Sequence, residues 1–243
     1  MRILLIGYGK MGKTIEKIAL NRGHEIVGKI DLTNNAELTN FNYSNCDVAI
    51  EFTQPETALA NIKYCVNHRL PVVCGTTGWL EHKVDVEELC REKKSAFFYA
   101  SNYSIGVNLF FSINETIARM MNNHHEYKVS MQEIHHIQKL DAPSGTAITL
   151  AEGVFHGFPK IKKWTLEEEK ASESTIHIDA VREGEYPGTH SVFYKSEVDT
   201  IEIKHTAHSR QGFALGAVIA AEFLQGRKGV YNMRDLMSHF QTI

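Results

Sequence analysis

Residues 133–147, EIHHIQKLDAPSGTA, combine the side chains that acid–base chemistry and anion binding require. His135 and His136 are adjacent, Lys139 follows three residues later, and Ser144 opens a Ser-Gly-Thr run. Histidine suits a proton donor because its ordinary pKa, about 6.5, lies near neutral pH. A lysine and the N–H groups of a helix start attract a carboxylate. The stretch therefore predicts a general acid beside an anion pocket; a surface loop with an ordinary helix cap is the alternative.

Two elements must position these side chains. The histidines end a predicted strand, 127–136, and the Ser-Gly-Thr run precedes a predicted helix, 146–158, for which its serine or threonine is a suitable N-cap. Neighbouring strand residues point to opposite faces of a sheet. His135 and His136 are therefore not expected to hold one metal ion together, and no metal site is predicted.

A second chemically informative group is GYGKMG, from Gly7 to Gly12, which follows an apolar predicted strand and opens a predicted helix. In that context, G-x-G-x-x-G spacing predicts a dinucleotide-binding loop whose backbone N–H groups bind a pyrophosphate. Asp31, at the end of the next predicted strand, can accept hydrogen bonds from a ribose 2′-OH. A glycine-rich structural turn that binds nothing is the alternative.

The residues around Asp31 bear on the choice between NADH and NADPH. A carboxylate repels a 2′-phosphate, and Leu32 and the residues after it supply no base. Lys10, inside the glycine loop, is the nearest candidate phosphate partner, with a solvated surface lysine as the equal alternative. The sequence favours NADH and leaves NADPH open.

The first hundred residues alternate predicted strands and helices, which indicates a parallel sheet. Ligands bind beyond the carboxyl ends of such strands. Two of these ends, 75–78 and 100–104, carry small polar residues, and we expect them to contact the cofactor, with an aromatic side chain against the nicotinamide; plain loops are the alternative. The strands are expected at 2–6, 25–30, 46–52, 71–76 and 95–100, and the helices at 12–22, 56–68 and 85–94.

After residue 104 the pattern changes. A long helix (107–123) is followed by the segments described above and by strand-like stretches up to residue 209. This succession predicts an α+β domain with a mixed or antiparallel sheet. An apolar helix expected at 211–226 is predicted to return to the first domain. The predicted α/β architecture is thus a Rossmann-like parallel-sheet domain, residues 1–104 and 211–243, and a second domain, residues 105–210.

Composition excludes several function classes. The chain has 243 residues and a formal net charge of −3, which does not predict a nucleic-acid-binding surface. No apolar run approaches the roughly 18–20 residues that span a membrane, and the start is not expected to be a signal peptide. The four scattered cysteines indicate reduced thiols rather than disulfides or zinc ligands. A cytoplasmic protein that binds neither nucleic acid nor membrane is expected.

The stretch HHIQKLDAPSGTA resembles the signature of the dihydrodipicolinate reductase family, roughly H-H-x-x-K-x-D-A-P-S-G-T-A, with every fixed position filled. The resemblance implies reduction of 4-hydroxy-tetrahydrodipicolinate, a dicarboxylate, to tetrahydrodipicolinate with NADH or NADPH, in lysine and diaminopimelate biosynthesis. It also implies a homotetramer, with residues 105–210 serving substrate binding and tetramerisation. The glycine loop and the stretches EFTQPET (51–57), CGTTG (74–78), ASNYSIGVN (100–108) and EIKHTAHSRQGFALGAV (202–218) share the resemblance.

The resemblance also assigns roles to residues. It implies that His135 is the proton donor and that Lys139 is its partner, which holds a substrate carboxylate. Arg210 resembles a basic residue near an interdomain hinge and receives no role. The implied substrate-binding residues are His136, Ser144, Gly145 and Thr146, and the implied cofactor contacts are Gly7, Tyr8, Gly9, Lys10, Met11, Gly12, Asp31, Gly75, Thr76, Thr77, Ala100, Ser101, Asn102 and Tyr103.

Three departures from the family pattern concern cofactor preference and leave the catalytic motif intact. The glycine loop is one residue tighter than the common G-x-x-G-x-x-G form, the segment 31–46 is short, and Leu32 stands where many relatives carry a base. Two alternatives remain open: another nicotinamide oxidoreductase on the same fold, and a non-catalytic sensor of NAD(H). The sensor would not need the complete His-Lys and Ser-Gly-Thr set.

Overall fold

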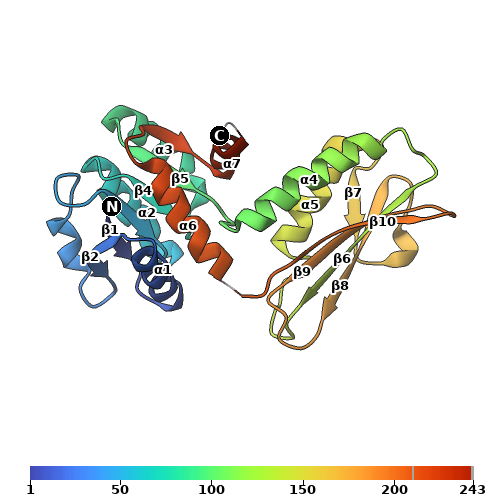
Figure 1. Ribbon diagram of the computed structural model, residues 1–243, viewed down its shortest axis with the longest axis horizontal. Coiled ribbons are helices and arrows are strands. Elements are labelled where there is room, and N and C mark those ends of the chain that lie inside the picture. The colour runs from blue at the N-terminus through green and yellow to red at the C-terminus, as the bar shows by residue number, and fades with distance from the viewer. Residues whose placement is uncertain (210, 242–243) are drawn as a thin grey trace. The chain divides into compact units, whose positions relative to one another are not determined.

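The computed structural model describes residues 1–209 and 211–241. Arg210, singled out in the sequence, lies outside the described residues. The chain divides into two compact units, Met1–Ile105 together with Gln211–Ile243, and Gly106–Arg210 (Figure 1). The first contains a parallel sheet with helices and the second a mixed sheet with helices, which confirms the predicted fold class.

The first unit is built on a six-stranded sheet in the order β11-β5-β4-β3-β1-β2, in which every pairing is parallel. The chain order reverses between β1 and β3, where ligands bind in such sheets. Its elements are β1 (Arg2–Ile6), α1 (Lys10–Asn21), β2 (Glu25–Ile30), η1 (Asn35–Asn40), β3 (Val48–Glu51), α2 (Pro55–Asn67), β4 (Val72–Cys74), η2 (Leu80–His82), α3 (Lys83–Lys93), β5 (Ala96–Tyr99), α6 (Gln211–Leu224), β11 (Gly229–Tyr231) and α7 (Met233–Gln241).

Alternate residues of β1 enter different hydrophobic cores because neighbouring strand residues point to opposite faces. Ile3 and Leu5 pack in one core with α1, α6 and α7. Leu4 and Ile6 pack in the other core with α2 and α3. The apolar run of β1 is therefore buried on both faces, and the glycine loop that follows it starts from a rigid support.

Two features of this unit bear on the sequence predictions. The segment after Asp31 forms only the short 3₁₀ helix η1, as its length suggested. The sequence did not predict β11, a three-residue strand that pairs with β5. A strand of this length carries too little alternation to be recognised without its partner.

The second unit contains a five-stranded sheet in the order β10-β9-β6-β8-β7. The pairs β10–β9 and β9–β6 are antiparallel, whereas β6–β8 and β8–β7 are parallel. Side chains of α4 and α5 pack with one face of this sheet in a single core. The elements are α4 (Ile105–Met121), β6 (Lys128–His135), α5 (Gly145–Gly157), β7 (Lys163–Thr165), η3 (Glu168–Lys170), β8 (Thr175–Arg182), β9 (Thr189–Lys195) and β10 (Thr200–Thr206).

Candidate active site

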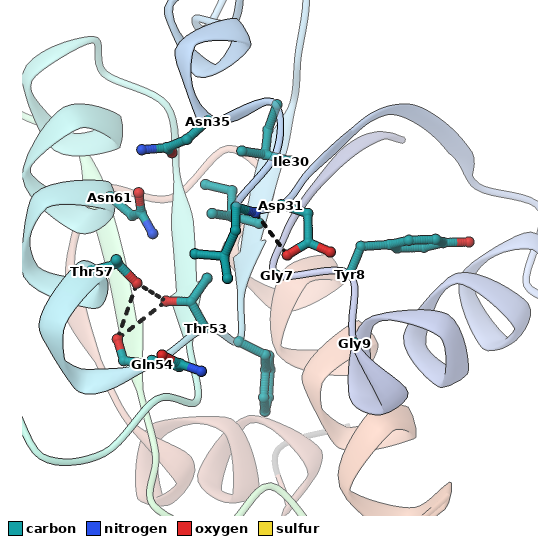
Figure 2. A pocket seen from close by; sticks show the side chains of 13 residues that line it. Gly7, Tyr8, Gly9, Ile30, Asp31, Asn35, Thr53, Gln54, Thr57 and Asn61 are labelled. Atoms are coloured by element: carbon teal, nitrogen blue, oxygen red, sulfur yellow. Dashed lines mark hydrogen bonds between the residues drawn. The ribbon is translucent and has the colours of Figure 1, made fainter.

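The first unit contains a pocket of about 250 Å³ at the carboxyl ends of β1, β2 and β3. Figure 2 shows Tyr8, Gly9 and Asp31 on one side of it and residues of α2 on the other. This is the point of strand-order reversal where an open α/β sheet accepts a ligand. Four of the predicted cofactor residues line the pocket: Gly7, Tyr8, Gly9 and Asp31.

Each glycine of the loop has a different steric environment. Gly7 has φ +94°, and a Cβ there would lie 2.0 Å from the Phe52 carbonyl oxygen. A Cβ on Gly12 would lie 2.2 Å from the Gly7 carbonyl oxygen, so this glycine lets α1 pack closely behind the strand. A Cβ on Gly9 would have no neighbouring atom within 4 Å. The loop therefore leaves open space at the start of α1, where helix N–H groups attract phosphate.

The charged group at the rim of the pocket is the carboxylate of Asp31. Asp31 is exposed, and its Oδ1 accepts a hydrogen bond from the Leu32 N–H at 2.9 Å. The ammonium of Lys29 forms a 2.5 Å ion pair with Glu16 and lies 4.9 Å from the centroid of the Tyr8 ring. Among the described residues that line the pocket, none is a lysine or arginine.

Tyr103, the aromatic residue that the sequence predicts against the nicotinamide, is buried in the structure. Tyr103 is 2% exposed, and its hydroxyl donates a 2.7 Å hydrogen bond to the carbonyl of Cys74. Its ring packs against Phe52 and Phe98 in the core. Its contact with the cofactor stays a prediction.

The remaining predicted cofactor residues lie outside the pocket lining. Thr76 is buried, and its hydroxyl oxygen accepts a hydrogen bond from the Thr53 N–H at 2.8 Å, which makes it a support for a lining residue. Thr77 is exposed beside it. The others are Lys10, Met11, Gly12, Gly75, Ala100, Ser101 and Asn102.

The wall of the pocket opposite Asp31 was not predicted. Phe52 follows β3, and Thr57 and Asn61 come from the first turns of α2. The Thr57 hydroxyl donates to the hydroxyl oxygen of Thr53 at 3.0 Å (Figure 2). The one available signal was the position of EFTQPET at a strand end, where ligand contacts are expected.

The second unit brings His135 together with residues from two neighbouring strands. In the ladders, His135 pairs with Arg182 of β8, and Glu133 pairs with His190 of β9. Glu133 and His135 lie two and four positions after the core residue Met131 in the same strand, so their side chains point to the face of the sheet that packs against the helices. Their ladder partners His190 and Arg182 lie on that face as well. Glu133, Arg182 and His190 were not predicted as site residues.

The carboxylate of Glu133 is fully buried and lies at the centre of this group. Both of its oxygens accept hydrogen bonds from the Ser144 N–H at 3.1 Å, and Arg182 donates to Oε1 at 2.8 Å. Burial would raise the pKa of Glu133, but the contacts of His190, Ser144 and Arg182 lower it to about 2. The group is therefore a carboxylate at any working pH.

His135 is only 7% exposed. Burial is the main cause that lowers its pKa to about 4, and His190, Lys139 and Arg182 lower it further while Glu133 opposes them. The ordinary histidine pKa expected from the sequence does not apply here. The imidazole is uncharged at neutral pH in the free protein.

The loop after β6 presents the other predicted residues of this site. Lys139 forms an ion pair with Asp141 at 2.7 Å, and His136 donates its backbone N–H to the Tyr186 carbonyl. Ser144 is the N-cap of α5, because its hydroxyl oxygen accepts from the Ala147 N–H at 3.2 Å. Gly145 and Thr146 form the first turn, whose N–H groups have no partner within the helix.

Metal binding at this cluster competes with existing hydrogen bonds. One ligand atom each of Glu133, His135 and His190 lies within 4.8 Å of the others, which is a spacing that could hold an ion. However, the Glu133 oxygens already accept from Ser144 and Arg182. A cation would also meet the positive charge of the guanidinium. The donor set fits a hydrogen-bonded network better than a metal centre.

Comparison with known proteins identifies the family. A sequence model described as dihydrodipicolinate reductase, N-terminus, matches residues 1–103, and one described as dihydrodipicolinate reductase, C-terminus, matches residues 106–237. The chain belongs to the dihydrodipicolinate reductase family. As a member of a reductase family, it is an oxidoreductase, and its first unit is a nicotinamide-cofactor-binding domain. The resemblance seen in the sequence is thus confirmed.

Two curated relatives and one solved structure are similar over almost the whole chain. The 4-hydroxy-tetrahydrodipicolinate reductase of Christiangramia forsetii is 52% identical over 98% of this chain and 98% of its own. That of Clostridium tetani is 34% identical over 98% and 97%. A dipicolinate-bound dihydrodipicolinate reductase from Paenisporosarcina sp. TG-14 has a TM-score of 0.75 at 22% identity, covering 97% of this chain and 99% of that one, and shows the shared fold.

Within residues 1–209 and 211–241, no helix has the length and apolar character needed to cross a membrane.

The buried His135 predicts a pH dependence of stability. Its folded-state pKa, about 4, lies below its ordinary value of 6.5, so the unfolded chain takes up a proton first as the pH falls. The free energy of unfolding should therefore decrease between pH 6.5 and pH 4, by at most about 1.4 kcal/mol per pH unit from this group. Denaturant unfolding at several pH values should show a shallower decrease for His135→Gln. His125→Gln, at an exposed histidine, is the control; identical slopes for wild type and His135→Gln would contradict the prediction.

Proposed function

We propose that this chain catalyses the reduction of 4-hydroxy-tetrahydrodipicolinate by NADH or NADPH, giving tetrahydrodipicolinate, oxidised cofactor and water, in lysine and diaminopimelate biosynthesis. The observation that carries the proposal is the conjunction of the buried His135 with Lys139 and the capped start of α5 in a chain of this family. A sensor of NAD(H) would need the glycine loop but not this second cluster.

The pocket of the first unit fits a dinucleotide. Gly9 leaves room at the start of α1 for a pyrophosphate, and Asp31 presents a carboxylate to a ribose hydroxyl. When bound, the nicotinamide cofactor supplies the hydride. The carboxylate at the rim, together with the pairing of Lys29 with Glu16, supports a preference for NADH because a 2′-phosphate would find no free cation among the described lining residues.

The second unit offers donors for a dicarboxylate substrate. The dipicolinate bound by the structurally similar reductase is itself a dicarboxylate. We infer that one carboxylate binds the N–H groups of Gly145 and Thr146 in the first turn of α5, which Ser144 caps, and that the other reaches Lys139 and His136. The Lys139 ammonium is held by the exposed Asp141, so a substrate carboxylate has to share or replace that partner.

In the proposed reaction, His135 is the residue that protonates the substrate. Its imidazole is uncharged in the free protein, and only the imidazolium can deliver a proton readily. Two negative charges on the substrate offset the positive charges of Lys139 and Arg182 that oppose protonation of the ring. Substrate binding therefore favours the protonated donor, which then gives its proton to the atom where negative charge develops.

Steady-state oxidation of the cofactor tests the function. The wild-type protein should oxidise NADH or NADPH only in the presence of substrate freshly made from pyruvate and aspartate semialdehyde. His135→Ala should lower turnover by about 10²–10⁴-fold, which is typical for loss of a general acid, with NADH affinity unchanged. Absence of oxidation by folded wild-type protein that binds NADH would reject the function. Wild-type turnover in His135→Ala would reject the role of the histidine.

Cofactor preference can be tested at Leu32, which lines the pocket and is 74% exposed. Leu32→Arg places a cation beside the expected 2′-phosphate and should raise NADPH affinity by about tenfold, or about 1.4 kcal/mol, relative to NADH. Leu80→Arg, at another exposed leucine of the same unit, is the matched control. The ratio of kcat/KM values for the two cofactors is the measurement. A wild-type preference for NADPH, or no change in Leu32→Arg, would contradict the assignment.

We infer a homotetramer formed through the sheet of the second unit. Residues of β6 and β9 that point away from the helices, such as Gln132 and Phe193, are absent from the hydrophobic core of this unit. Light scattering should give about four times the 27.5 kDa chain mass. Phe193→Glu should lower that mass, whereas Val198→Glu, in the exposed turn after β9, should not. A monomeric wild-type protein would contradict the inference.

Four buried free cysteines also support a cytoplasmic location.

A further inference from the structure

The buried charge of Glu133 has no role in the reaction as proposed so far. A carboxylate removed from water is costly unless it is paired and hydrogen-bonded. Arg182 and the Ser144 N–H provide that pairing. Oε2 also faces two imidazoles, at 3.5 Å from Nδ1 of His135 and 3.6 Å from Nε2 of His190. Neutralising the charge of Glu133 does not by itself require that this oxygen lie between two histidines.

We propose that Glu133 is the positioning residue of the site, which orients the His135 imidazole through Nδ1 and leaves Nε2 to carry the transferred proton. The assignment of His135 as donor rests on the proposed function. The orientation of its ring by Glu133 does not, and it can be measured without substrate.

The surroundings of the His135 ring distinguish its two nitrogens. Nδ1 is buried and makes no hydrogen bond within the described structure, so the carboxylate oxygen 3.5 Å away is the acceptor it can reach. Catalytic hydrogen bonds are often long in a free enzyme and shorten in the complex. On the Nε2 side stands Gly188, with φ +149°, where a Cβ would lie 2.9 Å from that nitrogen. A residue without a side chain is thus placed against the reactive edge of the ring.

The charges around His135 give Glu133 a second effect. The groups that face the ring are Glu133 from its own strand, Arg182 from β8, His190 from β9 and Lys139 from the following loop. Three of them disfavour protonation of the imidazole, and Glu133 is the one that favours it. Since the carboxylate is held in its charged form by Arg182 and Ser144, it stabilises the imidazolium at every working pH.

The same carboxylate anchors the substrate pocket. Its oxygens accept from the Ser144 N–H, and Ser144 in turn caps α5 and lies 3.0 Å from Nε2 of His190 through its hydroxyl. The far end of the loop from His136 to Pro143 is therefore hydrogen-bonded back to Glu133, in the strand from which the loop starts. Proton donor and anion-binding helix start share this anchor, which fixes their separation.

The variant Glu133→Gln tests the proposal because it removes the charge while keeping the shape and one acceptor oxygen. We expect kcat to fall by about tenfold or more, with KM changed much less and the descending limb of the pH–rate profile moved to lower pH. Glu185→Gln removes the same charge from an exposed position in the loop between β8 and β9 and should leave both unchanged. A Glu133→Gln protein that folds and keeps the wild-type pH profile would overturn the proposal.

Nitrogen NMR of histidine-labelled protein tests the orientation without turnover. His135 is assigned by loss of its signals in His135→Gln. In wild type, the neutral ring should carry its proton on Nδ1, and its titration near pH 4 should move to lower pH in Glu133→Gln. A neutral ring with its proton on Nε2 would overturn the proposal even if Glu133→Gln does not fold. If wild type shows the expected form but turns over no substrate, the proposed function fails and the positioning role stands.

Discussion

The buried carboxylate of Glu133 is the constraint around which the candidate site of the second unit is arranged. A charge inside a protein is tolerated only when donors surround it, so the surrounding chain has to supply them in fixed places. Here they come from Arg182 on the neighbouring strand β8 and from the Ser144 N–H at the start of α5. The need to satisfy one anion thereby orders a loop, a helix terminus and a histidine together.

Strand register is the means by which this constraint is met. Glu133 stands opposite His190 in the antiparallel ladder, and His135 stands opposite Arg182 in the parallel one. A shift of one residue in either pairing would turn these side chains to the other face of the sheet. The chemistry of the second unit consequently depends on the register of β6 with both of its neighbours, the antiparallel β9 on one side and the parallel β8 on the other.

The pocket of the first unit is formed in a different way from the charged cluster of the second unit. This pocket is formed by close backbone approach rather than by charge. Gly7 and Gly12 allow the loop, β3 and α1 to meet at distances that a Cβ would prevent, and the pocket wall is completed by Phe52 and the first turns of α2. An uncharged wall with one carboxylate at its rim suits a ligand whose phosphates are bound by backbone N–H groups. The second unit, with its cations and titratable groups, suits the proton-transfer half of the reaction.

The sequence by itself determined the features that depend on local pattern: the strand–glycine–helix unit ending at Gly12, a capped helix start at Ser144 or Thr146, and the stretch that contains His135 and Lys139. It could not determine the partners of His135, because Arg182 and His190 are more than forty residues away and only the pairing of three strands brings them to it. Nor could it determine that Tyr103 is a core residue or that the pKa of His135 is near 4, since both follow from burial, which is the sum of contacts from the whole unit. Local composition selects which groups are present, and tertiary packing decides which of them meet and in what protonation state.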